Sequence, residues 1–359
     1  MKKECYHTHH AARVEGMLGE LNQSHVVLVR GTGSIGSRHL RLLRDRLGLK
    51  PIAFPTRQQS FTQLRSEGYE VATNLEEAKA FGTTAAIIAT ATSRHLADGR
   101  ELIDAGCHVL IEKPIAVDSQ GLSLLSARAH ELDRSIFVAC CLRFDAGLLL
   151  FRERLSEIGR IHFVRIECQS YLPDWRPGRD YRSGYAASKT EGGVLRDLIH
   201  EIDYATWIFG RPTQVWAKLQ NHGILGIESE ESADLEWNAP GDLPISVHLD
   251  YLTRKSQRTM RAFGEHGEIE WRAHEQQLIL RIAGKDPQTI TINADRDEMY
   301  VQQSLAFLNA IAGESSGNLA SFDDGAFAIA LCDAARTSSQ SGASQDIRTV
   351  KSTQQASSV

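Results

Sequence analysis

The clearest chemical signature in the sequence is a glycine loop that could hold the phosphates of a dinucleotide. Gly31, Gly33 and Gly36 follow the strand-like run Val26–Val29 as G-x-G-x-x-G and open a helical stretch, Ser34–Leu47. The first glycine permits a tight turn, the second lets the backbone approach a pyrophosphate, and the third packs helix on strand. The helix N-terminus would add free N–H groups and a positive dipole end. We therefore expect NAD or NADP as cofactor. The candidate cofactor-binding residues of this loop are Gly31, Gly33, Ser34, Ile35 and Gly36.

The segment after the second predicted strand bears on the choice between the two cofactors. An Asp or Glu about 20 residues beyond the glycine loop typically binds the ribose hydroxyls of NAD. Here the chain has Phe54-Pro55-Thr56-Arg57 instead. This segment has no carboxylate that would repel the 2′-phosphate of NADP. Thr56 and Arg57 could bind that phosphate, which favours NADP slightly. Alternatively, Arg57 stacks on adenine and the protein accepts either cofactor.

Three further side chains could stabilise charge and move a proton at a carbinol. Lys113 follows the predicted strand His108–Ile111, at the carboxyl edge where α/β sheets bind ligands, and its ammonium could stabilise a reacting oxygen. Asp197 and His200 are three apart in a predicted helix over 195–209, so they share one face. A carboxylate beside an imidazole can orient it and raise its basicity. The structural alternatives are a solvated lysine, a capping Asp and a buried His.

An aromatic and basic loop, residues 171–185, precedes that helix. Aromatic rings suit the apolar faces of a pyranose, and arginines suit anions. The loop therefore indicates a sugar that carries a phosphate, a nucleotide diphosphate or a carboxylate. It is equally compatible with a dimer contact, because the same residue types are enriched at interfaces. The candidate substrate-binding residues are Arg143, Trp175, Arg176, Arg179, Tyr181 and Tyr185.

Two kinds of predicted architecture position these residues. From residue 26 to 141, short β-branched runs alternate with amphipathic stretches, which predicts βαβ units on a parallel sheet. After residue 211, strands succeed one another, and two helices, at 298–312 and 322–337, close the chain. We predict an α/β fold, with an N-terminal Rossmann domain and a C-terminal α/β domain whose open sheet is mostly antiparallel. The predicted ranges are a mobile N-terminal extension at 1–24, the dinucleotide-binding Rossmann domain at 25–143, a substrate and oligomerisation domain at 144–341, and a loose tail at 342–359.

Composition excludes several classes of function. The 359 residues are 42% hydrophobic and 24% charged with a net charge of −5, which is the balance of a soluble globular protein. No basic patch predicts nucleic-acid binding, and no apolar run predicts a membrane span or a signal peptide. Six scattered cysteines lack zinc spacing, so we expect no metal site and a cytoplasmic location. The tract His7-Thr8-His9-His10 could bind a metal adventitiously, although a mobile terminus is the simpler interpretation.

Three segments together resemble the glucose–fructose oxidoreductase / inositol dehydrogenase / MocA family. They are residues 87–95, residues 105–114 with Glu112-Lys113-Pro114 as their most specific part, and residues 191–203. The resemblance extends from about Val26 to the last helix. It implies an NAD(P)-dependent oxidoreductase that transfers a hydride to or from a secondary alcohol or ketone of a sugar or sugar derivative, including anionic, amino- or nucleotide-linked sugars. It also implies a homo-dimer or homo-tetramer formed through the C-terminal sheet.

The resemblance assigns roles to individual residues. It implies that Lys113 contacts both cofactor and substrate, that His200 is the acid/base, and that Asp197 positions the substrate and His200. We thus expect these three catalytic groups to act together on the substrate carbinol. The further cofactor-binding residues that the resemblance implies are Thr90, Thr92, His95, Glu112, Lys113 and Pro114.

The chain departs from the family pattern at several positions. Asp197 and His200 are three apart, where many members space the pair by four. Asp145 stands where the family has a His, and Arg30 precedes the glycine loop, where a small residue is common. Two rival functions therefore stay open: a non-catalytic NAD(P)-binding regulatory protein of the same fold, and a dehydrogenase of a non-sugar diol. Intact Lys113 and His200 argue against the first.

Overall fold

The protein is described from a computed structural model, which describes residues 4–6 and 25–348. The chain divides into two compact units, and each is built from separate stretches of sequence. Residues 25–144 and 295–326 form the unit that we call the Rossmann unit. Residues 4–6, 145–294 and 327–348 form the other, which we call the open-sheet unit.

The Rossmann unit contains a seven-stranded sheet in the order β16-β7-β6-β5-β2-β3-β4. All neighbours are parallel except β16, which pairs antiparallel with β7 at the edge. The strands are β2 (Val26–Arg30), β3 (Ile52–Phe54), β4 (Glu70–Val71), β5 (Thr83–Ile88), β6 (His108–Glu112), β7 (Ile136–Ala139) and β16 (Ala320–Ser321). The strand order reverses between β2 and β5, and in open α/β sheets the ligand binds outside the carboxyl ends of such strands.

Helices cover both faces of this sheet. They are α2 (Ser34–Asp45), α3 (Gln59–Ser66), α4 (Leu75–Ala80), α5 (His95–Asp104), α6 (Leu122–Glu131) and α10 (Glu298–Ile311). Residues of α2 and α10 share one hydrophobic cluster with alternate strand residues such as Val29 and Ile87. On the other face, Gly99 of α5 lies close to Ile88, Ile111 and Leu125. The unit is therefore doubly wound, as the strand–helix alternation predicts.

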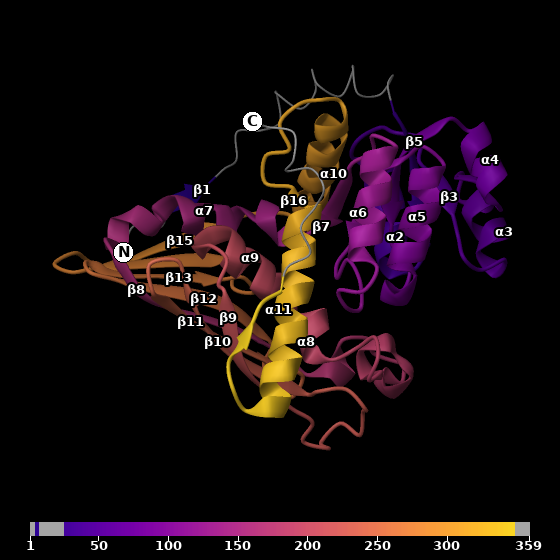
Figure 1. Ribbon diagram of the computed structural model, residues 1–359. Coiled ribbons are helices and arrows are strands. Elements are labelled where there is room, and N and C mark those ends of the chain that lie inside the picture. The colour runs from indigo at the N-terminus through magenta and orange to yellow at the C-terminus, as the bar shows by residue number, and fades with distance from the viewer. Residues whose placement is uncertain (1–3, 7–24, 349–359) are drawn as a thin grey trace. The chain divides into compact units, whose positions relative to one another are not determined.

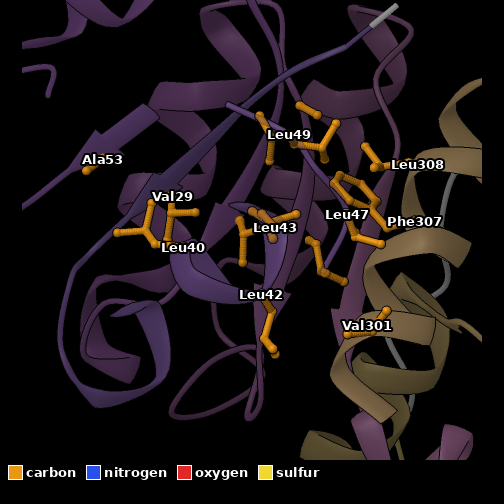
Figure 2. Packing of buried hydrophobic residues seen from close by; sticks show 14 of the residues in the cluster. Val29, Leu40, Leu42, Leu43, Leu47, Leu49, Ala53, Val301, Phe307 and Leu308 are labelled. Atoms are coloured by element: carbon orange, nitrogen blue, oxygen red, sulfur yellow. The ribbon is translucent and has the colours of Figure 1, made fainter. Parts of the chain in front are cut away.

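The position of α10 differs from the predicted domain ranges, which place residue 298 and its neighbours in the C-terminal domain. In the structure, residues 295–326 belong to the Rossmann unit. The physical reason is apolar burial, because Val301, Phe307 and Leu308 of α10 lie against Leu43 and Leu47 from the α2 region (Figure 2). Each such side chain contributes about 1.5–3 kcal/mol when buried. The predicted range 144–341 is thus interrupted.

The open-sheet unit contains a ten-stranded sheet among the described residues, in the order β1-β15-β14-β13-β12-β8-β11-β10-β9-β17. Only the pairs β1–β15 and β8–β11 are parallel, so the sheet is mostly antiparallel, as predicted. Its strands are β1 (Glu4–Tyr6), β8 (Ile161–Gln169), β9 (Gln214–Gln220), β10 (Ser232–Ala239), β11 (Leu243–Asp250), β12 (Gln257–Gly264), β13 (Gly267–Arg272), β14 (Gln277–Ile282), β15 (Gln288–Ile292) and β17 (Gln345–Asp346).

One face of this sheet carries the helices of the unit (Figure 1). They are α7 (Ala146–Arg154), α8 (Val194–Asp197), α9 (His200–Phe209) and the part of α11 (Phe322–Ser341) that follows residue 326. Buried and exposed side chains alternate along the strands of this sheet. In β10, Ala233, Leu235 and Trp237 are buried, whereas Glu236 and Asn238 are exposed. Such period-two burial is typical of a sheet covered on one side.

Two predicted segments outside the domains differ in part from expectation. Glu4–Tyr6, within the extension predicted to be mobile, pairs with β15 as β1, and residues 7–24, including the His7–His10 tract, lie outside the described residues. In the tail predicted to be loose, Gln345–Asp346 pairs with β9, and residues 349–359 lie outside the described residues. No helix in the described part of the chain is long and apolar enough to cross a membrane.

Candidate functional site

The glycine loop between β2 and α2 leaves open space at one of its three glycines. Gly31 has a left-handed backbone (φ +88°), and a Cβ there would lie 2.7 Å from the carbonyl oxygen of Ala89. A Cβ on Gly36 would lie 1.9 Å from the carbonyl oxygen of Gly31. At Gly33, by contrast, a Cβ would meet no atom within 4 Å. The protein itself thus requires the first and third glycines, whereas the second borders a space that a phosphate could enter.

The N-terminus of α2 is open to an anion. Gly33 caps the helix without a side-chain hydrogen bond, and the first turn contains no acidic residue. Gly33 and Ser34 are exposed. The first N–H groups of a helix have no intrahelical acceptor and attract negative charge. Together with the open space at Gly33, this donor set fits the pyrophosphate of a dinucleotide.

Asp98 organises the loop after β5, beside the glycine loop. Its carboxylate accepts hydrogen bonds from Thr90 Oγ1 (2.8 Å), from Arg94 Nη2 (2.8 Å) and from Arg30 Nε (3.3 Å). Burial alone would raise the pKa of Asp98, but the hydrogen bonds from Arg94 and Thr90 and the nearby arginine charges lower it. Arg30 also stacks on the Phe54 ring at 3.9 Å. This unusual residue before the glycine loop is therefore held by protein groups, and Thr90 has a fixed hydroxyl.

The buried histidine His95 connects the loops after β5 and β6. Its Nδ1 lies 2.9 Å from the carbonyl oxygen of Pro114, and its Nε2 lies 3.2 Å from that of Thr90. Burial lowers its pKa. Both ring nitrogens thus face the protein backbone, and the predicted contact of His95 with the cofactor stays a prediction. Thr92, on the same loop, is half-buried.

The segment Glu112-Lys113-Pro114 follows β6 at the same carboxyl edge of the sheet. Glu112 Oε1 lies 2.8 Å from Nε2 of His39, a fully buried residue of α2, and Glu112 Oε2 accepts the backbone N–H of Lys113 at 3.3 Å. The Lys113–Pro114 peptide bond is cis. Lys113 is half-buried. His39, which sequence reasoning missed, therefore joins α2 to the loop that carries Lys113.

The predicted 2′-phosphate residues lie just beyond β3. Thr56 and Arg57 are exposed there, and residues 54–60 contain no acidic residue. The backbone N–H of Gly31 donates to the carbonyl oxygen of Phe54 at 3.0 Å, which joins the end of β3 to the glycine loop.

In the open-sheet unit, Asp197 and His200 do not lie in one continuous helix, and that prediction is wrong. Asp197 ends α8 and His200 begins α9, because Leu198 leaves helical geometry (φ −98°, ψ 31°). Both side chains are buried. Gly192 and Gly193 allow the chain to enter α8: a Cβ on Gly192 would lie 2.3 Å from the carbonyl oxygens of residues 185 and 186, and one on Gly193 2.2 Å from the Glu230 carboxylate.

Tyr251 is the partner of Asp197 that sequence reasoning missed. Its hydroxyl donates to Asp197 Oδ2 at 2.6 Å across 54 residues of sequence. Tyr251 follows β11 and is fully buried; burial and then the charge of Asp197 raise its pKa. A single tyrosine at the end of a predicted strand gives no signal of such a contact, so only the fold reveals it.

The predicted substrate loop, residues 171–185, is divided between protein contacts and solvent. Tyr181 donates its hydroxyl to the carbonyl oxygen of Leu225 at 3.0 Å. Trp175 and Tyr185 are 37% and 45% exposed, and Arg176 and Arg179 are exposed as well. Among the candidate substrate-binding residues, these four side chains are exposed and thus accessible to a ligand.

Arg143 lies in the Rossmann unit and is buried. Its Nη1 lies 3.2 Å from Asp324 Oδ2 in an ion pair. The predicted contact of Arg143 with substrate stays a prediction. Among the described residues, no group of three or more His, Cys, Asp or Glu side chains could hold a metal ion.

Two family models match the chain. Residues 25–140 match the model described as an oxidoreductase family with an NAD-binding Rossmann fold. Residues 153–270 match the model of the GFO/IDH/MocA C-terminal domain. The two matches lie in the Rossmann unit and the open-sheet unit, respectively.

Individual proteins give weaker but consistent similarity. Myo-inositol dehydrogenase Hyg17 of Streptomyces leeuwenhoekii is 29% identical over 192 residues, which cover 52% of this chain and 56% of that protein. Inositol 2-dehydrogenase/D-chiro-inositol 3-dehydrogenase of Halalkalibacterium halodurans is 26% identical over 191 residues, 50% of this chain and 51% of that protein. The chain thus spans about half the length of these curated relatives. A solved structure of levoglucosan dehydrogenase in complex with NADH shares the fold, with a TM-score of 0.78 and 19% identity over 91% of this chain and 100% of that one.

Proposed function

The chain belongs to the GFO/IDH/MocA family of oxidoreductases, and we propose that it is an NAD(P)-dependent dehydrogenase or reductase acting on a secondary alcohol or ketone of a sugar-like compound. The observation that carries this proposal is the open space at Gly33 beside the uncapped N-terminus of α2. Two relatives are named for inositol and one solved structure for levoglucosan, which supports a cyclic, polyhydroxylated substrate.

The residues proposed to hold the cofactor lie along the carboxyl edge of the Rossmann sheet. The N–H groups at the start of α2 bind the pyrophosphate, with Gly33 giving close approach. The rest of the dinucleotide is proposed to contact Thr90 and the segment Glu112–Pro114. The hydroxyl of Thr90 is fixed by its hydrogen bond to Asp98. When bound, the nicotinamide accepts or supplies the hydride.

Lys113, Asp197 and His200 are the proposed catalytic groups. The Lys113 ammonium stabilises negative charge on the reacting oxygen. His200 takes the hydroxyl proton in oxidation and returns it in reduction. Asp197, which accepts the Tyr251 hydroxyl, orients the substrate and His200.

The exposed part of the substrate loop is proposed to recognise the sugar. Trp175 and Tyr185 offer ring surface to the apolar face of a pyranose. Arg176 and Arg179 suit a phosphate or carboxylate on the substrate, because a guanidinium binds such groups with two parallel hydrogen bonds. An anionic sugar derivative is therefore the proposed substrate class.

NADP is the proposed preference over NAD. Arg57 is exposed at the end of β3, and residues 54–60 lack the carboxylate that would repel a 2′-phosphate. A cytoplasmic location, which suits the buried free cysteines among the described residues, and a homo-oligomer formed through the open sheet stay predictions.

A substrate screen tests the proposal. The purified protein is incubated with NAD or NADP and with a panel of inositols, anhydrosugars, sugar acids and nucleotide sugars, and the nicotinamide absorbance is followed in both directions. The proposal requires turnover of at least one such compound. Cofactor binding without turnover of any panel member would favour a regulatory protein of the same fold.

A further inference from the structure

Tyr251 occupies a position from which it can control the proposed catalytic carboxylate. We propose that Tyr251 is a positioning residue that holds Asp197 in one orientation and joins it to the substrate loop. The inference rests on the proposed function, because it assigns Tyr251 a part in that reaction. It concerns contacts within the open-sheet unit alone.

Every part of Tyr251 is engaged with a different segment of this unit. Its hydroxyl donates to Asp197 Oδ2 at 2.6 Å. Its backbone N–H donates to the carbonyl oxygen of Glu231 at 2.9 Å, and its own carbonyl oxygen accepts the N–H of Leu172 at 3.0 Å. Its side chain is fully buried. A residue fixed at so many points presents its hydroxyl in a single place.

The ring of Tyr251 also supports the substrate loop. The Trp175 ring packs against it edge to face, with 5.4 Å between centroids and 89° between planes. Trp175 Nε1 donates to Ser170 Oγ at 2.9 Å, which leaves the indole oriented while 37% of the residue stays exposed. Aromatic pairs of this geometry are favourable beyond their burial. The ring of Tyr251 therefore contacts and supports Trp175 of the substrate loop.

The backbone around Asp197 does not supply this orientation by itself. Asp197 is the last residue of the four-residue helix α8, and Leu198 departs from helical geometry directly after it. A buried carboxylate needs donors, and a hydroxyl bonded to a charged group makes one of the stronger hydrogen bonds available. The hydrogen bond from Tyr251 thus fixes the position of Oδ2 of Asp197.

Tyr251→Phe is the informative variant, because it removes the hydroxyl and keeps the ring on which Trp175 packs. Tyr204→Phe is the matched control: Tyr204 is equally buried, and its hydroxyl donates to Glu201 at 3.4 Å instead of to Asp197. For a substrate found in the screen, we expect Tyr251→Phe to lower kcat roughly 10- to 100-fold, the order of cost of a misplaced group. KM should change less than about threefold, since the loss belongs to the chemical step. Tyr204→Phe should leave both constants within about threefold of wild type.

The isotope effect separates positioning from a merely structural role, and urea unfolding tests the hydrogen bond itself. With substrate deuterated at the reacting carbon, the isotope effect on kcat should rise in Tyr251→Phe and stay at the wild-type value in Tyr204→Phe. In urea unfolding, Tyr251→Phe and Asp197→Asn should shift the midpoint non-additively, because the two groups share one hydrogen bond.

The outcomes distinguish this inference from the proposed function. An active wild type with unchanged kcat and isotope effect in Tyr251→Phe would overturn the inference alone. Additive shifts in urea would overturn it without any assay of activity. An inactive wild type across the whole panel would count against the proposed function, and against the catalytic part of this inference with it.

Discussion

At the scale of single residues, the glycine loop separates requirements of the fold from requirements of the ligand. Gly36 is required by the fold, since its Cβ would overlap the carbonyl oxygen of Gly31 at 1.9 Å. Gly33 meets nothing within 4 Å, so only a bound ligand would need the absence of a side chain there.

Gly33→Val should therefore fold and fail to bind. A valine at this helix N-cap costs about 1 kcal/mol, which lowers the unfolding temperature by only about 2–4 °C. The affinity for NADH and NADPH should fall by more than about tenfold, because the branched side chain occupies the proposed phosphate space. Calorimetry of the folded variant measures this loss, and Gly36→Val, as the contrast, should lose stability as well as binding. Unchanged affinity in Gly33→Val would refute the proposed cradle.

Arg57 tests the proposed cofactor preference. Arg57→Ala should weaken NADP(H) more than NAD(H), because only the former carries the 2′-phosphate that the guanidinium would bind. The lost charge-assisted hydrogen bond corresponds to roughly 10- to 100-fold in the dissociation constant of NADP(H). Titration of both cofactors against wild type and Arg57→Ala provides the comparison. Equal losses for the two would mean that Arg57 stacks on adenine or takes no part.

At the scale of elements, a histidine between two carboxylates joins neighbouring strands of the open sheet. His248 of β11 has Nδ1 2.6 Å from Asp234 Oδ1 on β10 and Nε2 3.2 Å from Asp250 Oδ2. The hydrogen bond with Asp250, followed by that with Asp234, outweighs desolvation and raises the pKa of His248 to about 9. Burial would raise the pKa of Asp250, but the hydrogen bond from His248, with further donors from Gln169 and Thr253, lowers it.

These shifts fix how stability depends on pH. A histidine whose folded pKa exceeds the unfolded value of about 6.5 stabilises the fold fully below that pH and loses the contribution as pH rises towards 9. His248→Gln should thus lower the unfolding temperature more at pH 6 than at pH 10. Differential scanning fluorimetry across this range measures the gap between the two proteins. A gap for His248→Gln that does not vary with pH would contradict the assigned ion pairs.

At the scale of the whole molecule, the sequence predicted the features that depend on interactions between residues close together in the chain. The βαβ alternation, the glycine loop and the switch to an antiparallel sheet depend on residues close together in the chain, and all three appear in the structure. The interruption of the helix between α8 and α9 could not be predicted from the sequence, because Leu198 is neither a glycine nor a proline. Two other features depend on residues far apart in the chain: α10 belongs to the Rossmann unit, and Tyr251 contacts Asp197. The periodicity of hydrophobic residues predicts local elements and not such contacts.

The proposed function assigns catalytic roles to Lys113 and to His200. The most direct test of this account is the rate of nicotinamide absorbance change with a panel substrate, compared between wild type, Lys113→Ala and His200→Ala. General acid–base groups contribute about 10²–10⁴-fold, so we predict that turnover in each variant falls by at least about 10²-fold. In His200→Ala, cofactor affinity should stay near the wild-type value. Similar turnover in wild type and both variants would contradict the account, because neither residue would then take part in the reaction.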